Sequence, residues 1–139
     1  MNDPSMDPGR TDEAEVSVLA TISREMVRLY KEQFGRGPTK ARTNFAGPDV
    51  LVCTLENSLT PAERKMAERG EHQRLRDLRL YFQYATEEEF RSTVEHHLGR
   101  PVRAFVSGMD TVEDVATEIF YLGPRSAADG DVSSPGEAT

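Results

Sequence analysis

The sequence contains a single cysteine, Cys53, and lacks any long apolar run. One thiol cannot form an internal disulfide, which is typical of a protein from a reducing compartment. The longest fully apolar runs are about four residues, whereas a membrane-spanning helix needs ~20. The N-terminal segment is acidic and has no apolar core, so it is not typical of a secretory signal. We therefore expect a cytoplasmic protein that does not insert into a membrane.

The negative charge of the chain is concentrated at its two ends. The net charge is −7, yet residues 16–122 hold 16 acidic and 15 basic side chains. The ends are rich in small, polar and turn-forming residues, which bury too little apolar surface to offset the entropy of ordering. This predicts disordered tails at 1–11 and 123–139 around one folded domain at 12–122. The nearly neutral domain argues against nucleic acid as its partner.

The first half of the domain predicts a helix followed by a hairpin. Apolar residues recur at helical spacing up to Phe34, with Asp12 as the expected N-cap. The period then changes to two, which predicts strands at 40–45 and 50–56 around a Gly-Pro turn. Along 40–45, we expect one face to carry Ala41, Thr43 and Phe45, and the other Lys40, Arg42 and Asn44.

The second half repeats this order. Thr60, Pro61 and Glu63 form a capping box that starts a long helix, with a kink or restart expected near Ala85. The helix ends at Gly99. Strands are then expected at 102–107 and 114–122, with a loop between them through Gly108.

Two segments share the order helix end, Gly-Arg, Pro, strand, turn, Asp-Val and strand. Gly35-Arg36 corresponds to Gly99-Arg100, and Asp49-Val50 to Asp114-Val115. Two copies are too few for a solenoid. The repeat predicts an α+β fold: two-layer αββαββ, with a four-stranded, mainly antiparallel sheet and helices on one face.

The glycines of Gly35-Arg36-Gly37-Pro38 do not form a phosphate loop. Such loops lie between a strand and a following helix, whereas these glycines follow a helix and precede a strand. Pro38 also lacks a backbone N–H. The motif is interpreted as a helix stop.

No constellation of catalytic residues emerges from the sequence. Cys53 lies in an apolar strand without a basic partner, which favours a buried structural thiol. His96 and His97 are adjacent and lack the spacing of helical metal ligands. Glu118 is expected on the polar face of the sheet, paired with Arg103 or Arg42. We therefore predict no catalytic, cofactor-binding or metal-binding residues, and a protein that is not an enzyme.

Five basic side chains are spaced 4, 3, 4 and 3 along the second predicted helix, which places them on one exposed stripe. This basic stripe is either a solvated helix face or a dock for an acidic partner, a phosphate-bearing ligand or an RNA backbone. Gly70 within it weakens the helix. Its members are Lys65, Arg69, His72, Arg76 and Arg79.

The sheet face opposite the helices is expected to be exposed or paired. By simple alternation, Phe105 points to that face. An exposed aromatic residue among polar strand positions indicates a subunit interface, and we predict a homodimer.

Several segments resemble the MpsC-like family, a bacterial domain of unknown function described as a component of a Na+-translocating, membrane-potential-generating system. They are "FGRGP" (34–38), "VLVCTLENSLTPAE" (50–63), "HHLGRPV" (96–102) and "DVATEIFYL" (114–122). The resemblance covers about residues 13–122. It implies an accessory protein of a cation-translocating membrane system and carries over no catalytic residue.

These observations predict a non-enzymatic, soluble accessory or interaction module with a protein partner, in the family context a membrane transport complex. The alternative is a regulator that binds a small ligand or nucleic acid through the basic stripe.

Overall fold

The computed structural model describes residues 8–125, with side chains from residue 13. The tails expected at 1–11 and 123–139 lie largely outside these residues. In chain order the elements are α1 (Pro8–Phe34), β1 (Lys40–Phe45), β2 (Val50–Glu56), α2 (Pro61–Glu68), α3 (His72–Ala85), α4 (Glu87–Leu98), β3 (Val102–Asp110) and β4 (Val115–Leu122). α1 begins at Pro8, so the predicted N-cap at Asp12 is wrong.

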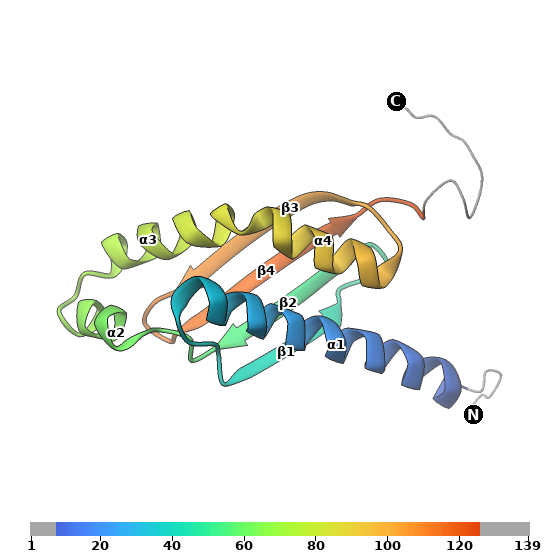
Figure 1. Cartoon of the computed structure of the whole chain (residues 1–139), viewed down its shortest axis with the longest axis horizontal. Helices are drawn as coiled ribbons and strands as arrows, with labels where there is room; N and C mark the ends of the chain where they lie inside the picture. Colours follow the sequence, from blue (N-terminus) through green and yellow to red (C-terminus); the bar gives the residue numbers. More distant parts are fainter. Residues whose placement is uncertain (1–7, 126–139) are drawn as a thin grey trace.

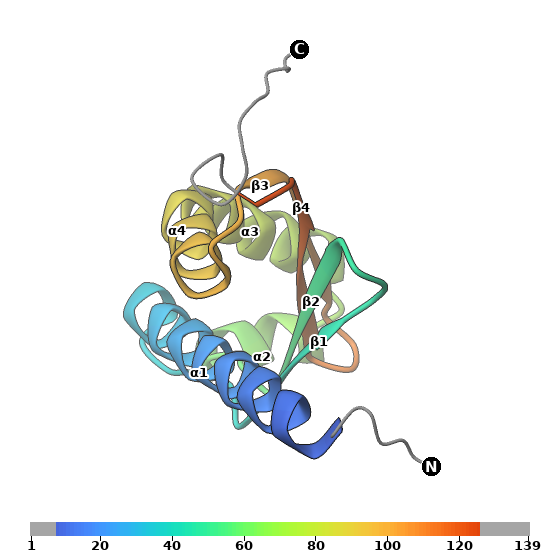
Figure 2. The ribbon, with the colours of Figure 1, turned by 90° about the vertical axis from the view of Figure 1, so that its right-hand side faces the viewer.

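The four strands form one antiparallel sheet in the order β1-β2-β4-β3. Figure 1 shows α1, α3 and α4 in front of this sheet, and the turned view of Figure 2 shows all three on the same side of it. The predicted two-layer α+β fold is therefore confirmed. One sheet face is covered by helices and the other is not.

The core lies between the covered face and the helices. α1 contributes one stripe of buried side chains, because residues three or four apart share a helix face. The strands contribute every second residue, as the alternating burial of β2 and β4 shows. The buried apolar residues include Ile22, Met26, Leu29, Tyr30, Leu51, Leu55, Leu75, Phe90, Val94, Phe105 and Phe120.

The predicted long second helix is divided into three. The capping box at Thr60 forms as expected, with Thr60 and Glu63 bonded to each other's backbone. Gly70 adopts a left-handed φ of +81° and separates α2 from α3. The restart expected near Ala85 is confirmed, since α3 ends there and α4 begins at Glu87.

A β-bulge reverses the expected facing of β3. The pairing with β4 is irregular between Val102 and Ala104, and an inserted residue moves every later side chain to the opposite face. Phe105 is therefore buried rather than exposed, and its ring packs on Phe90 and Phe120. β3 also runs on to Asp110, so the loop expected at Gly108 is wrong.

The two Gly-Arg motifs are helix stops, as predicted. Gly35 and Gly99 both take a left-handed φ after a helix end. Arg36 Nη1 donates to the carbonyl oxygens of Asn57 (2.9 Å) and Leu59 (2.8 Å). Arg100 Nε similarly donates to the Gly123 carbonyl oxygen at 2.8 Å. Each arginine thus ties its helix end to the end of the second strand of the same repeat.

Candidate functional site

The basic stripe does not form one exposed helix face. Lys65 lies on α2 and Arg69 caps its end, while the other three members lie on α3 beyond the break at Gly70. Lys65 and Arg69 are exposed, and His72 and Arg76 are half-buried. The expected alignment is wrong because a left-handed glycine redirects the chain in the middle of the stripe.

Arg79, the last member of the stripe, is fully buried. Its Nη1 donates to Glu63 Oε1 at 2.8 Å, and its Nη2 donates to Ser58 Oγ at 2.8 Å. The guanidinium also stacks over the Phe34 ring, 3.7 Å from its centroid. Arg79 therefore fastens α3 to the start of α2, and it is not available to a ligand. The expectation that it is exposed is wrong.

His72 and Arg76 contact the far end of the β3–β4 hairpin. His72 Nδ1 lies 2.7 Å from Thr111 Oγ1, and Arg76 Nε donates to the Met109 carbonyl oxygen at 3.4 Å. A surface pocket of about 320 Å³ lies beside them, bordered by Arg64 and Asp114 as well as His72. His72 is the one stripe member that lines this pocket, where it lies with Arg64 and the carboxylates of Glu68 and Asp114.

Glu118 is fully buried on the helix-covered face, not on the polar face where we expected it to pair with Arg103 or Arg42. Tyr30 Oη on α1 donates a hydrogen bond to Glu118 Oε2, while Oε1 has no partner among the described residues. Cys53 is its cross-strand neighbour on β2. The signal was present in the sequence: Glu118 has the same parity as Phe120 along β4.

A polar row crosses the covered face through these central residues. Thr43 pairs with Cys53, Cys53 with Glu118, and Glu118 with Ser107 on β3. Thr43 Oγ1 lies 3.4 Å from Cys53 Sγ. Helix side chains extend the row at both ends, Ser23 to Thr43 at 2.7 Å and Gln83 to Ser107 at 2.6 Å.

Burial changes the acidity of all three ionisable members of this core. Desolvation raises the pKa of Glu118 to about 8, against the lowering effect of Ser107, Tyr30 and Arg79. It raises the pKa of Cys53 to about 12. The pKa of Tyr30 is also raised, by burial first and then by Glu118. At neutral pH these groups are mostly protonated and shielded from substrate.

The uncovered sheet face has an apolar centre. Val52, Ile119 and Val106 are cross-strand neighbours on β2, β4 and β3, and Val106 is 44% exposed. Arg103 lies over the Tyr121 ring at 5.7 Å from its centroid. Lys40 and Glu56 form an ion pair of 4.0 Å at the rim.

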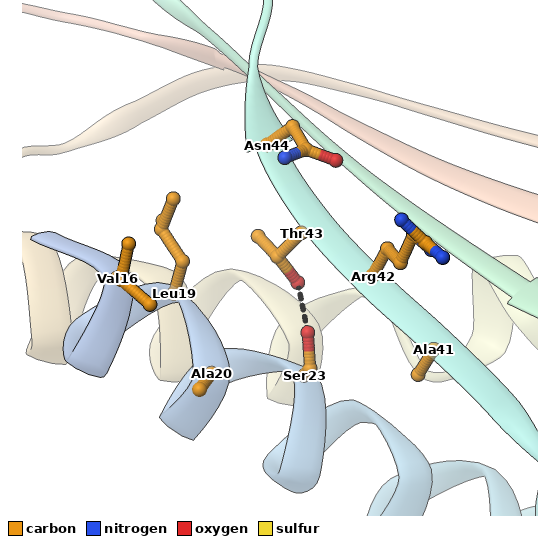
Figure 3. Close-up of a pocket in the computed structure, with 8 residues that line it drawn as sticks. All are labelled: Val16, Leu19, Ala20, Ser23, Ala41, Arg42, Thr43 and Asn44. Carbon is orange, nitrogen blue, oxygen red and sulfur yellow. Dashed lines mark hydrogen bonds between the residues drawn. The ribbon is translucent and has the colours of Figure 1, made fainter.

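A shallow pocket of about 260 Å³ lies between α1 and the edge strand β1. We call it the α1–β1 groove; it is lined by Val16, Leu19, Ala20, Ser23, Ala41, Arg42, Thr43 and Asn44. Figure 3 shows Ser23 and Thr43 bridging the helix and the strand, with Arg42 and Asn44 directed to the opposite side of the strand. The alternation predicted for β1 is confirmed by its burial pattern.

The described residues contain neither a membrane-spanning helix nor a cluster of metal ligands. None of the helices between residues 8 and 125 combines the length and the apolar composition needed to cross a bilayer. Within the same range, no three His, Cys, Asp or Glu side chains converge as a metal site would require.

These features define a small two-layer α+β domain made of two αββ repeats around a buried polar row. A family model described as "Na+-translocating membrane potential-generating system (MpsC)" matches residues 15–123. The chain belongs to this family. No curated protein and no solved structure matches the chain.

Proposed function

We propose that this MpsC-family protein is a non-enzymatic accessory module that acts through protein–protein contacts in the cytoplasm. We propose as its partner a subunit of a cation-translocating membrane system, in line with the family description. The observation that carries the proposal is the uncovered sheet face. The apolar row on this face consists of the exposed Val106 and the half-buried Val52 and Ile119, whereas helices cover the opposite face.

The burial of the core supports a role without catalysis. Burial raises the pKa of both Glu118 and Cys53, and both side chains are 0% exposed. Neither lines the α1–β1 groove, the pocket beside His72 or the pocket between α1 and α4. A catalytic group must come within hydrogen-bond reach of its substrate. Turnover of a defined substrate by the purified protein, lost in Glu118→Gln, contradicts this part of the proposal.

The partner is tested by affinity purification of the tagged protein from detergent-solubilised cells, with membrane and soluble fractions kept separate. We expect an integral membrane subunit of a cation-translocating system to be recovered with the protein and not with the tag alone. Recovery of the protein by itself from both fractions contradicts the accessory role.

We also propose a homodimer that pairs two uncovered sheet faces. The reason first given for it, an exposed Phe105, no longer holds, but Val106 now presents an apolar side chain at that face. Sedimentation velocity is expected to show a dimer that Val106→Glu dissociates. Val112→Glu is the matched control, because Val112 is 69% exposed and lies in the β3–β4 loop. A wild-type monomer at high concentration, or a dimer that survives Val106→Glu, contradicts the homodimer.

The second candidate is a regulator that binds an anionic ligand beside the remainder of the stripe. It is favoured by the pocket of about 320 Å³ that Arg64 and His72 border. The double variant Arg64→Glu and His72→Gln, changed at the two residues that border the pocket, is then expected to abolish binding without unfolding. A polyanionic ligand also predicts a steep dependence on salt concentration. Unchanged binding in the double variant removes this candidate.

A further inference from the structure

We propose that the outer edge of β1, together with the α1–β1 groove, binds an extended acidic segment of a partner protein as a fifth strand. This inference rests on the proposed interaction function and adds a second contact surface beside the uncovered sheet face. The segment adds to the sheet through main-chain hydrogen bonds, a recognised mode of peptide binding at exposed sheet edges. Its side chains then divide between the groove and the uncovered face.

The two edge strands of the sheet, β1 and β3, differ in how many of their main-chain groups bond to helix side chains. Side chains from α3 and α4 bond to the main chain of β3. Tyr84 Oη accepts from Ser107 N at 2.9 Å and donates to Ser107 O at 3.4 Å. Arg91 and Glu95 bond to the carbonyl oxygen and the N–H of Val102. The β3 edge is thus closed to another strand, as natural sheets protect their edges.

The β1 edge has no such protection in the part of the chain that the structure describes. Ala46 N donates to Val50 O at 2.8 Å at the end of the hairpin. Bonded pairs recur at every second residue of an antiparallel ladder, so the N–H and C=O of Ala41, Thr43 and Phe45 are directed outward. Within residues 8–125, none of these groups bonds to a turn, a loop or a side chain.

The groove beside this edge supplies an apolar surface for alternate side chains of the added strand. Val16 is 62% exposed on α1 and lines the groove with Leu19 and Ala20. The described residues therefore cover less than half of the Val16 side chain. Every second residue of an added strand points to the helix side, where it meets these three residues (Figure 3).

The charge of β1 selects an acidic segment rather than a second copy of the strand. β1 carries Lys40 and Arg42 and no carboxylate. Arg42 is exposed and makes no ion pair among the described residues. Two β1 strands paired with each other would bring together two Arg42 side chains without an ion pair and two Lys40 side chains that already pair with Glu56, and like charges opposite each other are destabilising. A segment with Asp or Glu on the Arg42 side and apolar residues on the groove side complements both surfaces.

A titration with a defined peptide tests this inference. The probe is a capped ten-residue peptide that alternates glutamate and valine, and its matched control carries lysine in place of glutamate. We expect saturable binding of the glutamate peptide, seen as amide shifts in an ¹⁵N–¹H spectrum confined to β1 and the groove-lining part of α1. The outward amides of Ala41, Thr43 and Phe45 should exchange with solvent at least tenfold more slowly in the complex.

Two protein variants test the contribution of charge, and a modified peptide tests the main-chain hydrogen bonds of strand addition. Arg42→Glu should abolish binding of the glutamate peptide and permit binding of the lysine peptide. Arg103→Glu makes the same charge change on the exposed side of β3 and should leave both affinities unchanged. N-methylation of the peptide amides that face β1 should remove binding without altering a side chain.

Each alternative outcome overturns the inference. In these outcomes, the glutamate peptide does not bind, or it binds Arg42→Glu as tightly as wild type. Alternatively, the amide shifts map to the pocket beside His72, or two copies of the protein dimerise through β1. In the affinity purification, Arg42→Glu and wild type can recover the membrane subunit equally well. That result contradicts the proposed binding at the β1 edge but remains consistent with the accessory role. If the wild-type protein recovers no subunit, the accessory role is contradicted. The peptide titration then still tests whether the β1 edge and the α1–β1 groove bind an acidic segment.

Discussion

Cys53 on β2 and Glu118 on β4 stand opposite each other at the centre of the sheet, and neither side chain is exposed. Each lies four residues after the aspartate that precedes its strand, Asp49 or Asp114, so the two are equivalent positions of the αββ repeat. Their edge-strand neighbours, Thr43 and Ser107, are equivalent as well. The repeat therefore brings two hydroxyls, a thiol and a carboxyl into one buried row.

The buried carboxyl makes stability depend on pH. Burial raises the pKa of Glu118 from 4.5 to about 8, so the folded state keeps a proton that the unfolded state releases at lower pH. Stability should fall as pH rises from about 4.5 to about 8, by at most ~1.4 kcal/mol per pH unit. In Glu118→Gln this slope should disappear. Urea unfolding across that range measures it, with Glu88→Gln on the exposed side of α4 as the control. Parallel profiles for wild type and Glu118→Gln contradict the assignment.

The buried ion pair of Arg79 and Glu63 should be sensitive to loss of one partner. Arg79→Ala leaves the Glu63 carboxylate, which has a side chain only 10% exposed, without its cation. Removing one member of a buried pair costs about 3–5 kcal/mol. Arg74→Ala, which breaks the exposed pair with Glu71, should cost less than about 1 kcal/mol. Equal losses in denaturant unfolding indicate that Arg79 is not anchored as the structure shows.

Cys53 should be inert in the folded protein. Burial raises its pKa to about 12 and closes it to solvent, while thiol reactivity requires an accessible thiolate. Alkylation by iodoacetamide should be at least ~100-fold slower in the native protein than in concentrated urea. Mass spectrometry of timed samples measures the ratio. Rapid labelling of the native protein shows that the core opens more readily than this packing allows.

The protection of the β3 edge should depend on Tyr84. Tyr84→Phe removes the hydroxyl that bonds to both main-chain groups of Ser107. A hydrogen bond contributes about 1 kcal/mol net, so the Ser107 amide should exchange roughly fivefold faster with solvent. Tyr81→Phe is the control, because Tyr81 is 70% exposed on the same helix. If exchange at the Ser107 amide is unchanged, Tyr84 does not protect the β3 edge. This outcome contradicts the difference between the β3 and β1 edges on which the β1 proposal depends.

The elements themselves were largely predictable because local signals specify them. Period-two patterns fixed β1 and β2, and the capping box at Thr60 fixed the start of α2. Gly99 gave the end of α4 through its left-handed conformation. The repeat of these signals was enough to predict the αββαββ order and the antiparallel sheet.

The candidate site was harder to predict, because burial and facing depend on distant residues. Arg79 has the spacing of the basic stripe, which we expected to be exposed. It is buried instead, and Glu63 and Ser58 accept hydrogen bonds from its guanidinium group. Phe105 has the parity of an exposed residue, yet the bulge near Val102 turns it inward. The bulge has no signature in the flanking residues, whereas Arg79 lies four residues after Leu75 and therefore shares its buried helix face.

By itself, the sequence determined most of the elements and the absence of an internal disulfide, since these follow from local periodicity, caps and composition. Its motifs gave the family resemblance, which the family model matches. Only the tertiary structure decided which buried polar groups bond to one another and how the helices meet the two sheet edges. Glu118 faces the core by its parity along β4, but the packing of α1 brings Tyr30 to it. Side chains of α3 and α4 bond to the main chain of β3, and within residues 8–125 no helix side chain does so at the outer edge of β1. Such choices are made by packing between segments far apart in the chain, where no local pattern specifies the outcome.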